Sequence, residues 1–292
     1  MTREVYPAGI HDLPVETYYD DPCVEPSLNS SGIRTLLEQT PAHFKAKNSR
    51  LTDYPDFATV STREMDLGTI IHGLILGKGQ QVDICEFDDW RTKAAQQQRE
   101  FSRSQGRIPV IRRVYNEAFD IAERAEQALS KRFGSWPIGK SEQTIIWQRD
   151  TAVGRIWCRA LIDHLFEPIL LDIKTTGKSI SDEELAKKLA GDGADLQAAW
   201  YTEGLETVMP QLAGRVQFIF AVLEVEPPYA IRFVTLSESW LTRARMRIAR
   251  AAITFAACLR QDNWPGWPAT ASLSAPTWLE SRWTNAELEE TT

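Results

Sequence analysis

The chain has 292 residues, of which 43% are hydrophobic and 25% charged, and its formal net charge is −7. Ten Trp and eleven Phe are too many for a disordered chain, and the absence of an 18-residue apolar run argues against a transmembrane helix. The four Cys lie far apart without a C-x-x-C pair, which argues against a zinc ribbon, an iron–sulfur cluster or a disulfide framework and indicates reduced thiols in the cytoplasm.

The first half of the chain predicts helices after an extended start. Residues 1–26 contain four prolines and are expected to form an extended lead-in. A short helix follows, with Ser30 or Ser31 as its N-cap and Pro41 marking its end. The later elements of this half are a buried helix over 65–76, a polar segment over 91–106 that is either mobile or a solvent-facing helix, and an amphipathic helix over 114–133.

The second half of the chain begins with strand-like patterns. Three strands are expected over 144–148, 155–165 and 169–174, and the unbroken apolar run of the third predicts a central strand covered on both faces. The remaining elements are helices over 181–189 and 195–208, strands over 215–223 and 229–236, and a long helix over 238–259. This order of strands and helices indicates an α/β fold.

Basic residues are concentrated in one part of the chain. Residues 91–160 hold 14 Lys/Arg and 7 Asp/Glu, so this stretch carries +7 and the remainder −14. Such asymmetry is compatible with a basic face for an anionic partner, and also with an ordinary solvated surface. Residues 91–113, which include Arg91 and Lys93, contain seven basic residues and one acid. We expect this stretch to bind DNA and to become fully ordered only with it, although a solvated polar helix remains an alternative.

Two carboxylates and a lysine give the strongest chemical signal. Asp163 lies near the end of one predicted strand, and a short turn leads into the strand that carries Asp172 and Lys174. An antiparallel hairpin would bring both carboxylates to one end of the sheet, and residues two apart on a strand project from the same face. Carboxylate oxygens are ligands that Mg²⁺ prefers, and a lysine beside them can act on a metal-held water during phosphodiester hydrolysis. An ion pair at a strand end is the structural alternative.

Four other polar residues are ambiguous when each is considered alone. Gln197 and Tyr201 are four residues apart on a predicted helix, so they share a face that could hold a phosphate or a water, or form a polar rim. His72 lies within the apolar helix over 65–76 and is either a core histidine or a metal ligand. Glu142 precedes the first strand and alone would be a surface acid.

The order of these residues resembles the RecB-like branch of the PD-(D/E)XK nuclease superfamily. More narrowly, the chain is similar to the exonuclease VIII (RecE-type) nuclease domains of phages and prophages. The likeness covers roughly residues 27–267. The matching segments are Ser27-Leu-Asn-Ser-Ser-Gly-Ile, Thr40-Pro-Ala-His-Phe, Leu67-Gly-Thr-Ile-Ile-His72-Gly-Leu, Arg91-Thr-Lys-Ala, Glu142 with Trp147, Gly154 through Asp163, Asp172-Ile-Lys-Thr-Thr, Asp195-Leu-Gln-Ala-Ala-Trp-Tyr and Trp264-Pro-Gly.

The resemblance implies a metal site. Asp163 and Asp172 would bind the catalytic metal, with the carbonyl of Ile173 as a further ligand. His72 matches the histidine that contacts the metal in this branch. Lys174 would act on the attacking water and on the scissile phosphate. The implied cofactor is Mg²⁺, with Mn²⁺ as a substitute.

The resemblance also implies roles in holding DNA. Glu142 matches an acid that helps to hold a second metal or orders its waters. Gln197 and Tyr201 would position DNA or Lys174. Ser31 and Arg34 stand where related exonucleases hold a terminal phosphate. The branch often has an aromatic residue where this chain has Ala194, so the helix motif departs from the pattern at that position.

The fold implied by the resemblance is a PD-(D/E)XK core, a mixed central sheet flanked by helices, with an N-terminal helical elaboration. We expect a lead-in over 1–26, a single nuclease domain over 27–267, and a tail over 268–292. Within the domain, the helical elaboration would cover 27–140 and the catalytic core 141–260.

The function implied by the resemblance is a metal-dependent exonuclease that degrades linear double-stranded DNA from 5′ to 3′ and leaves 3′ single strands for phage-type recombination. The implied partners are duplex ends, a single-strand annealing protein and further copies of the chain, in a ring, within the cytoplasm of a bacterial host. The alternatives are a structure-specific or single-strand nuclease of the same fold and a catalytically idle DNA-binding recombination protein. The intact set of Asp163, Asp172 and Lys174 argues against the idle protein. We find no Gly-rich phosphate loop, nucleophile elbow or H-E-x-x-H motif that would indicate a small-molecule enzyme.

Overall fold

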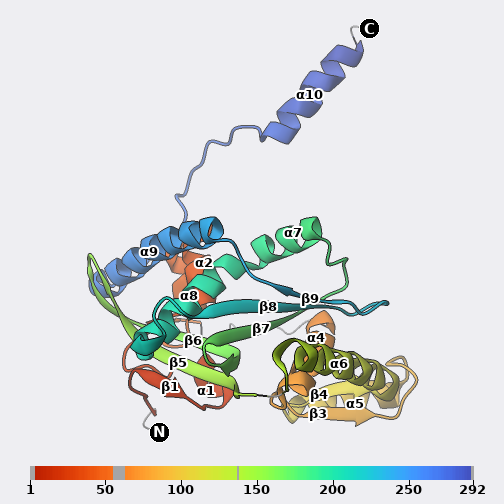
Figure 1. The fold of residues 1–292 in the computed structure, drawn as a ribbon. Coiled ribbons are helices and arrows are strands. Elements are labelled where there is room, and N and C mark those ends of the chain that lie inside the picture. The colour runs from red at the N-terminus through yellow and green to blue at the C-terminus, as the bar shows by residue number, and fades with distance from the viewer. Residues whose placement is uncertain (1–3, 55–62, 137, 291–292) are drawn as a thin grey trace.

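A mixed seven-stranded sheet forms the centre of the molecule (Figure 1). The structure, a computed structural model, describes residues 4–54, 63–136 and 138–290. Within these residues the strands follow the order β1-β5-β6-β7-β8-β9, and β2 also pairs with β6. The strands are β1 (Gly9–His11), β2 (Ser27–Leu28), β5 (Lys140–Thr151), β6 (Gly154–Phe166), β7 (Ile169–Thr176), β8 (Gln217–Glu224) and β9 (Ile231–Val234).

Helices cover both faces of this sheet. One face packs against α2 (Ser30–Glu38), α8 (Ala194–Val208) and α9 (Glu238–Gln261), and Trp147, Trp200 and Phe255 are fully buried in the core between them. The other face packs against α4 (Arg63–Leu76) and α6 (Arg112–Phe133). Strand β7 contributes Leu170 to the first core and Leu171 and Ile173 to the second. The central strand predicted over 169–174 is therefore present and covered on both faces.

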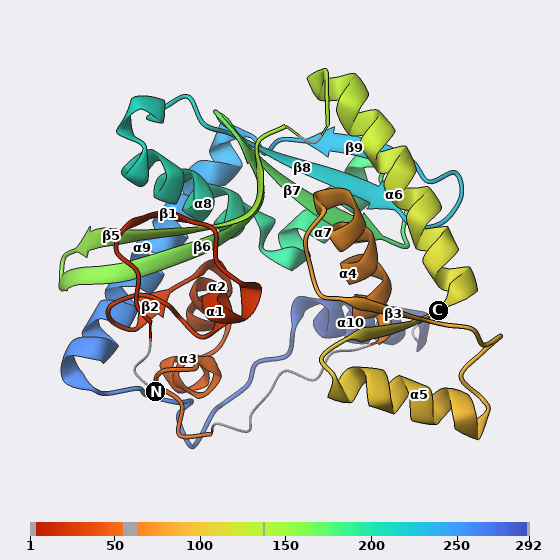
Figure 2. The ribbon, with the colours of Figure 1, turned by 90° about the horizontal axis from the view of Figure 1, so that it is seen from below.

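A small β-α-β unit lies beyond α4 (Figures 1 and 2). It consists of β3 (Val82–Cys85), α5 (Lys93–Ser104) and β4 (Ile108–Ile111), with β3 parallel to β4. The N-cap Thr92 accepts a hydrogen bond from the Ala95 N–H, and Asp83 of β3 accepts hydrogen bonds from Gln98 and Ser102 of α5. The polar segment over 91–106 thus contains a solvent-facing helix, the alternative that the sequence left open for it. That the stretch depends on DNA for its order stays a prediction. Residues 27–140 contain strands as well as helices.

The N-terminal part is more structured than its prolines predict. Strand β1 pairs with β5, and a short helix α1 (Val15–Tyr19) follows it within the expected extended lead-in. Asn29, and not Ser30 or Ser31, caps α2, because its side chain accepts the Gly32 N–H. Pro41 begins helix α3 (Pro41–Lys47), whose N-cap is Thr40, where the sequence predicted only the end of the preceding helix.

The segment that follows α9 packs against α3. Trp264 stacks on Phe44 with ring centroids 5.7 Å apart, and the Ala42 N–H donates to the Pro265 carbonyl. Helix α10 (Thr277–Glu290) stands away from the rest of the molecule (Figure 1). None of the helices that the structure describes is both long and apolar enough to cross a lipid bilayer.

Packing at Gly204 provides a test of the core between β5 and α8. A Cβ at Gly204 would lie 2.7 Å from Trp147 Cζ3, and Trp147 is itself fixed against Trp200 at a centroid distance of 4.7 Å. We expect Gly204→Ala to destabilise the protein by about 1–3 kcal/mol through overpacking, although Gly→Ala in an open helix position stabilises by roughly 0.5–1 kcal/mol. Gly191→Ala is the matched control, since nothing lies within 4 Å of its Cβ position. Equal stability of both variants in urea unfolding would contradict this account.

Candidate active site

The strands β6 and β7 diverge after a short stretch of pairing. Their ladder joins His164, Leu165 and Phe166 to Leu171, Leu170 and Ile169, and Asp163 and Asp172 are the next residues where the strands separate. The Ile173 N–H donates to Asp163 Oδ2 at 2.8 Å, across this opening. The structure therefore brings the two predicted carboxylates to the same end of the hairpin.

The sheet is distorted at the same level. Ile162 and Leu165 belong to the same core although they are three residues apart, so the alternation of β6 is interrupted between them. The neighbouring ladder joins Ser141 to His164 and Gln143 to Ile162 but skips Glu142, which adopts a φ of +49°. A non-glycine residue in this region is strained, and such strain is concentrated at functional sites. Glu142 and Asp163 lie at the same level, between these two pairs of the ladder. Burial raises the pKa of Glu142, His72 opposes this rise and Asp163 adds to it.

Lys174, Asp172 and Gln197 form one connected group. Lys174 Nζ lies 2.9 Å from Asp172 Oδ2 and donates to Gln197 Oε1 at 3.0 Å. The side-chain amide of Gln197 donates in turn to Asp172 Oδ1. Gln197 comes from the second turn of α8, so this helix fixes the position of both the lysine and the carboxylate.

His72 lies on the face of the sheet opposite to α8. Its Nε2 lies 2.9 Å from Asp163 Oδ2, and it belongs to α4. Burial opposes the charge on His72, but Asp163, helped by Asp172 and Glu142, raises the pKa of His72 to about 9. The histidine and Asp163 therefore form a charged pair near neutral pH in the absence of a cation.

The two carboxylates differ in their protonation. Burial raises the pKa of Asp172 to about 6, with Lys174 opposing the rise and Asp163 adding to it. Burial acts in the same direction on Asp163, but His72 and the Ile173 N–H outweigh it and lower the pKa of Asp163. Burial disfavours the charge on Lys174, yet Asp172 and Asp163 raise its pKa, so the ammonium stays protonated. Neighbouring carboxylates that repel one another commonly separate in pKa in this way.

The donor set fits a hard divalent cation, although its members are engaged with one another. Asp172 Oδ2 is buried and accepts no hydrogen bond of good geometry despite its closeness to Lys174, which leaves a lone pair for a cation. Carboxylate oxygens and one imidazole suit Mg²⁺ or Mn²⁺. Across the described part of the chain, no three His, Cys, Asp or Glu side chains are already arranged as a metal cluster. A cation would have to replace the contact between His72 and Asp163.

Tyr201 lies near the group but has a different partner. It is buried on α8, and its hydroxyl is hydrogen-bonded to Ser30 at the start of α2. Burial raises the pKa of Tyr201 well above its usual value, and the charges of Asp172 and Asp163 contribute. Tyr201 thus attaches α2 to α8 beside the carboxylates.

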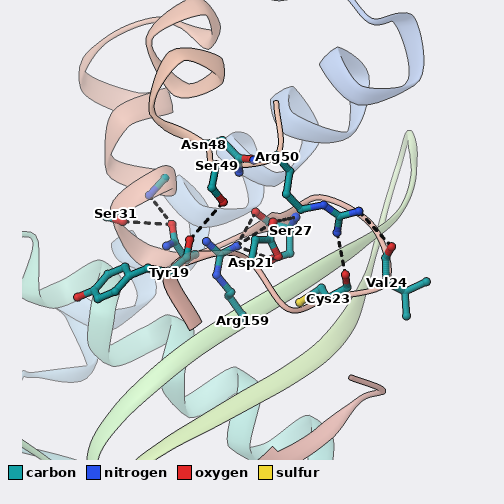
Figure 3. Close-up of polar contacts among 12 residues, drawn as sticks. Tyr19, Asp21, Cys23, Val24, Ser27, Ser31, Asn48, Ser49, Arg50 and Arg159 are labelled. Carbon is teal, nitrogen blue, oxygen red and sulfur yellow. Dashed lines mark hydrogen bonds and ion pairs between the residues drawn. The ribbon is translucent and has the colours of Figure 1, made fainter. Parts of the chain in front are cut away.

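The predicted phosphate-holding residues lie on α2 and have local partners. Ser31 Oγ donates to Asn29 Oδ1 at 3.1 Å (Figure 3). Arg34 Nε donates to Glu38 at 2.9 Å, and the Arg34 side chain packs beside Gly193, between α7 (Asp182–Asp192) and α8. Arg34 would have to leave Glu38 to hold a phosphate.

Arg91 and Lys93 are not part of the carboxylate group. Both are exposed at the start of the β3-α5-β4 unit, and Arg91 lies 3.4 Å from Asp89. The structure places them on a separate surface, beyond α4.

The sequence did not point to a buried ion pair beneath α1. Arg159 of β6 lies 3.1 Å from Asp21 and donates to Ser27 Oγ at 2.6 Å, and Asp21 accepts the Ser27 N–H (Figure 3). The pair holds the chain between α1 and α2 against β6. No sequence pattern indicates this pair, because Asp21 lies in an irregular loop without periodicity.

The sequence likewise did not point to Tyr19, which is 64% exposed. Partial burial, together with the charges of Asp163 and Glu142, raises the pKa of Tyr19, so its hydroxyl lies within electrostatic range of the carboxylate group.

The chain is similar to a known protein family and to solved structures. A family model described as "PDDEXK-like domain of unknown function (DUF3799)" matches residues 29–272. No curated protein sequence matches the chain. A crystal structure from Eubacterium rectale described as a "putative exonuclease" is similar with a TM-score of 0.59 and 12% identity, covering 91% of this chain and 96% of that one. A solved structure named SSO0001 is 12% identical with a TM-score of 0.28, covering 65% and 86%, which is too low to support an argument. The predicted mixed sheet flanked by helices is confirmed as a fold of the PD-(D/E)XK type.

Proposed function

Because this chain belongs to the family of PDDEXK-like domains described as DUF3799, we propose that it is a metal-dependent nuclease that hydrolyses phosphodiester bonds of DNA. One observation carries the proposal: Asp172, Lys174 and Gln197 are joined by direct contacts beside the pair of Asp163 and His72. These residues come from four different elements, and an ordinary ion pair at a strand end would not need them all.

In the proposed mechanism, a divalent cation held by Asp163, Asp172 and His72, with the Ile173 carbonyl as a further ligand, would supply positive charge at the scissile phosphate and an acidified water. Lys174 is a protonated donor that lies beside Asp172. It orients the attacking water or donates to the phosphate as negative charge increases in the transition state. Gln197 holds Lys174 in this position through one hydrogen bond and Asp172 through another. Glu142 would order further waters or a second cation at the rim.

The finer proposal is an exonuclease that acts on linear duplex ends from 5′ to 3′ and leaves 3′ strands for recombination. It is supported by the resemblance to RecE-type domains and by the description of the Eubacterium rectale protein. A homo-oligomeric ring around DNA and delivery of the product to a single-strand annealing protein belong to this proposal. A structure-specific or single-strand nuclease of the same fold is the alternative. Digestion of end-labelled linear duplex with and without Mg²⁺ tests both.

The active-site chemistry does not set the polarity, since either strand contains the same phosphodiester bond. We expect 5′-phosphorylated ends to be degraded faster than 5′-hydroxyl ends and covalently closed circles to resist, because Arg34 can hold a terminal phosphate with two hydrogen bonds. Arg34→Ala should reduce the preference for the 5′-phosphate. Arg155→Ala is a matched control, since Arg155 is also exposed and ion-paired, with Asp150 at the far turn of the β5–β6 hairpin.

Retention of the 5′ label while the 3′ end shortens would refute this polarity. Efficient cutting of closed circles would do the same and would favour the structure-specific nuclease.

A further inference from the structure

A groove begins where β7 ends. The last two residues of β7, the loop over 177–179 and helix α7 enclose a cavity of about 1050 Å³. Thr175 follows Lys174 directly, so the groove starts next to the lysine of the proposed active site. Neither the family description nor the proposed mechanism assigns a role to this cavity.

The lining of the groove is rich in hydroxyl groups and lysines. The end of β7 supplies Thr175 and Thr176, the loop supplies Lys178 and Ser179, and Gly177 has open space at its Cβ position. Lys178 is exposed and forms no ion pair with any residue that the structure describes. An exposed ammonium in a lining that also carries hydroxyl groups suits the phosphates of a nucleic-acid backbone.

Helix α7 forms the opposite wall, and each of its carboxylates has a cationic partner. Lys187 lies 2.7 Å from Glu183 and 3.0 Å from Glu184. Lys188 lies 3.0 Å from Asp192, and Asp182 lies 2.7 Å from Arg232. Among the described residues that line the groove, Lys178 is the lysine without a carboxylate partner.

The groove offers no surface for stacking bases. None of the described residues that line it is aromatic, whereas sites that hold single strands through their bases use aromatic side chains. Contacts to sugar and phosphate carry no sequence information. The chemistry of the lining thus fits the backbone of a strand and not its bases.

The groove adjoins the active site at both walls. On one wall, Thr175 directly follows Lys174 in β7. On the other wall, Asp192 is the last residue of α7. Gly193, the next residue, lies where a Cβ would contact Arg34 Cδ at 3.4 Å. A strand that lies in the groove would therefore pass Lys174 and the position of Arg34.

We propose that this groove binds the sugar–phosphate backbone of the DNA strand on one side of the scissile phosphate, without regard to sequence. The inference rests on the proposed function, because it assumes that DNA is the substrate. Lys178 is a binding residue in this account, and it holds a phosphate that is not the one hydrolysed.

The test compares Lys178→Ala with Lys131→Ala. Lys131 is an exposed lysine in the last turn of α6, on the other side of the sheet. Binding of a labelled linear duplex is measured by fluorescence anisotropy in Ca²⁺ over a series of KCl concentrations. Loss of one phosphate contact should reduce the slope of log K against log[salt] by about 0.9 for duplex DNA or about 0.7 for a single strand. We expect this reduction for Lys178→Ala and no change for Lys131→Ala, with equal effects on two duplexes of unrelated sequence.

Cleavage assays in Mg²⁺ add a second readout. Lys178→Ala should raise KM and leave kcat close to wild type, because the contact is made equally before and during the reaction. If wild-type protein binds and cuts linear DNA but Lys178→Ala has the wild-type salt slope, the groove proposal is wrong and the proposed function stands. If the wild-type protein neither binds nor cuts linear DNA with Mg²⁺, the proposed function is wrong and the groove proposal with it.

Discussion

Replacing Lys174 by alanine is expected to lower the rate of DNA cleavage by about 10²–10³-fold, the usual effect of removing one donor that stabilises a developing charge. The loss should fall on kcat, since the ammonium interacts most strongly with the phosphate in the transition state. DNA binding should persist, because Lys178, Arg34 and the other basic residues are unchanged. The measurement is single-turnover cleavage of an end-labelled duplex by folded protein.

Removal of a buried lysine side chain can unfold a protein, so the fold of the Lys174→Ala variant must be checked. Breaking a buried ion pair typically costs about 3–5 kcal/mol when the remaining charge stays unpaired. Here the pKa of Asp172 is already raised to about 6 by burial, so without Lys174 the carboxyl group can take up a proton and keep its hydrogen bond with Gln197. We therefore expect a folded protein by circular dichroism. Lys131→Ala controls for the loss of a lysine, and a near-wild-type rate for Lys174→Ala would refute the assignment.

Removal of the metal should lower the rate of DNA cleavage by at least as much as the Lys174→Ala substitution. We expect activity with Mg²⁺ or Mn²⁺, none in excess EDTA, and inhibition by Ca²⁺, which binds oxygen ligands with looser geometry. A metal that polarises a phosphoryl oxygen contributes several kcal/mol, which corresponds to roughly 10³-fold or more in rate. Full activity in EDTA would overturn the proposed function.

A variant of the donor set separates metal binding from catalysis. Asp172→Asn should weaken Mn²⁺ binding, measured by calorimetry without DNA, because a neutral amide is a poor substitute for a carboxylate. The control is Asp182→Asn, since Asp182 is an exposed acid paired with Arg232 at the start of α7. Equal Mn²⁺ affinity for both variants would place the cation elsewhere.

Local patterns in the sequence were sufficient to predict the hairpin that carries Asp163 and Asp172. The short turn between β6 and β7 fixes their register, so Asp163 and Asp172 had to lie opposite one another once both strands were recognised. Spacing on α8 predicted that Gln197 and Tyr201 share a helix face, the resemblance implied that they position DNA or Lys174, and in the structure Gln197 accepts a hydrogen bond from Lys174. These inferences hold because hairpin register and helix periodicity are local properties.

Features that depend on distant partners could not be predicted. The three residues of β1 are strand-like only because β5 lies beside them, and the pairing of β3 with β4 depends on the helix between them. The ion pair between Arg159 and Asp21 joins residues 138 positions apart. The positive φ of Glu142 is likewise imposed by the surrounding sheet, since glutamate has no preference for that conformation.

The opening between β6 and β7 implies a conflict between stability and activity. Asp163 contacts His72 of α4 on one face of the sheet, and Asp172 contacts Gln197 of α8 on the other. A continuous hydrogen-bond ladder between β6 and β7 would keep the side chains of these two helices apart. Each backbone hydrogen bond missing from the ladder forgoes about 0.5–1.5 kcal/mol of net stabilisation. Selection for thermal stability alone would therefore favour variants that extend the β6–β7 pairing past Leu171. Such variants would gain stability by closing an opening where residues from both faces of the sheet can share a ligand, so stabilising substitutions in this protein should be sought away from the hairpin.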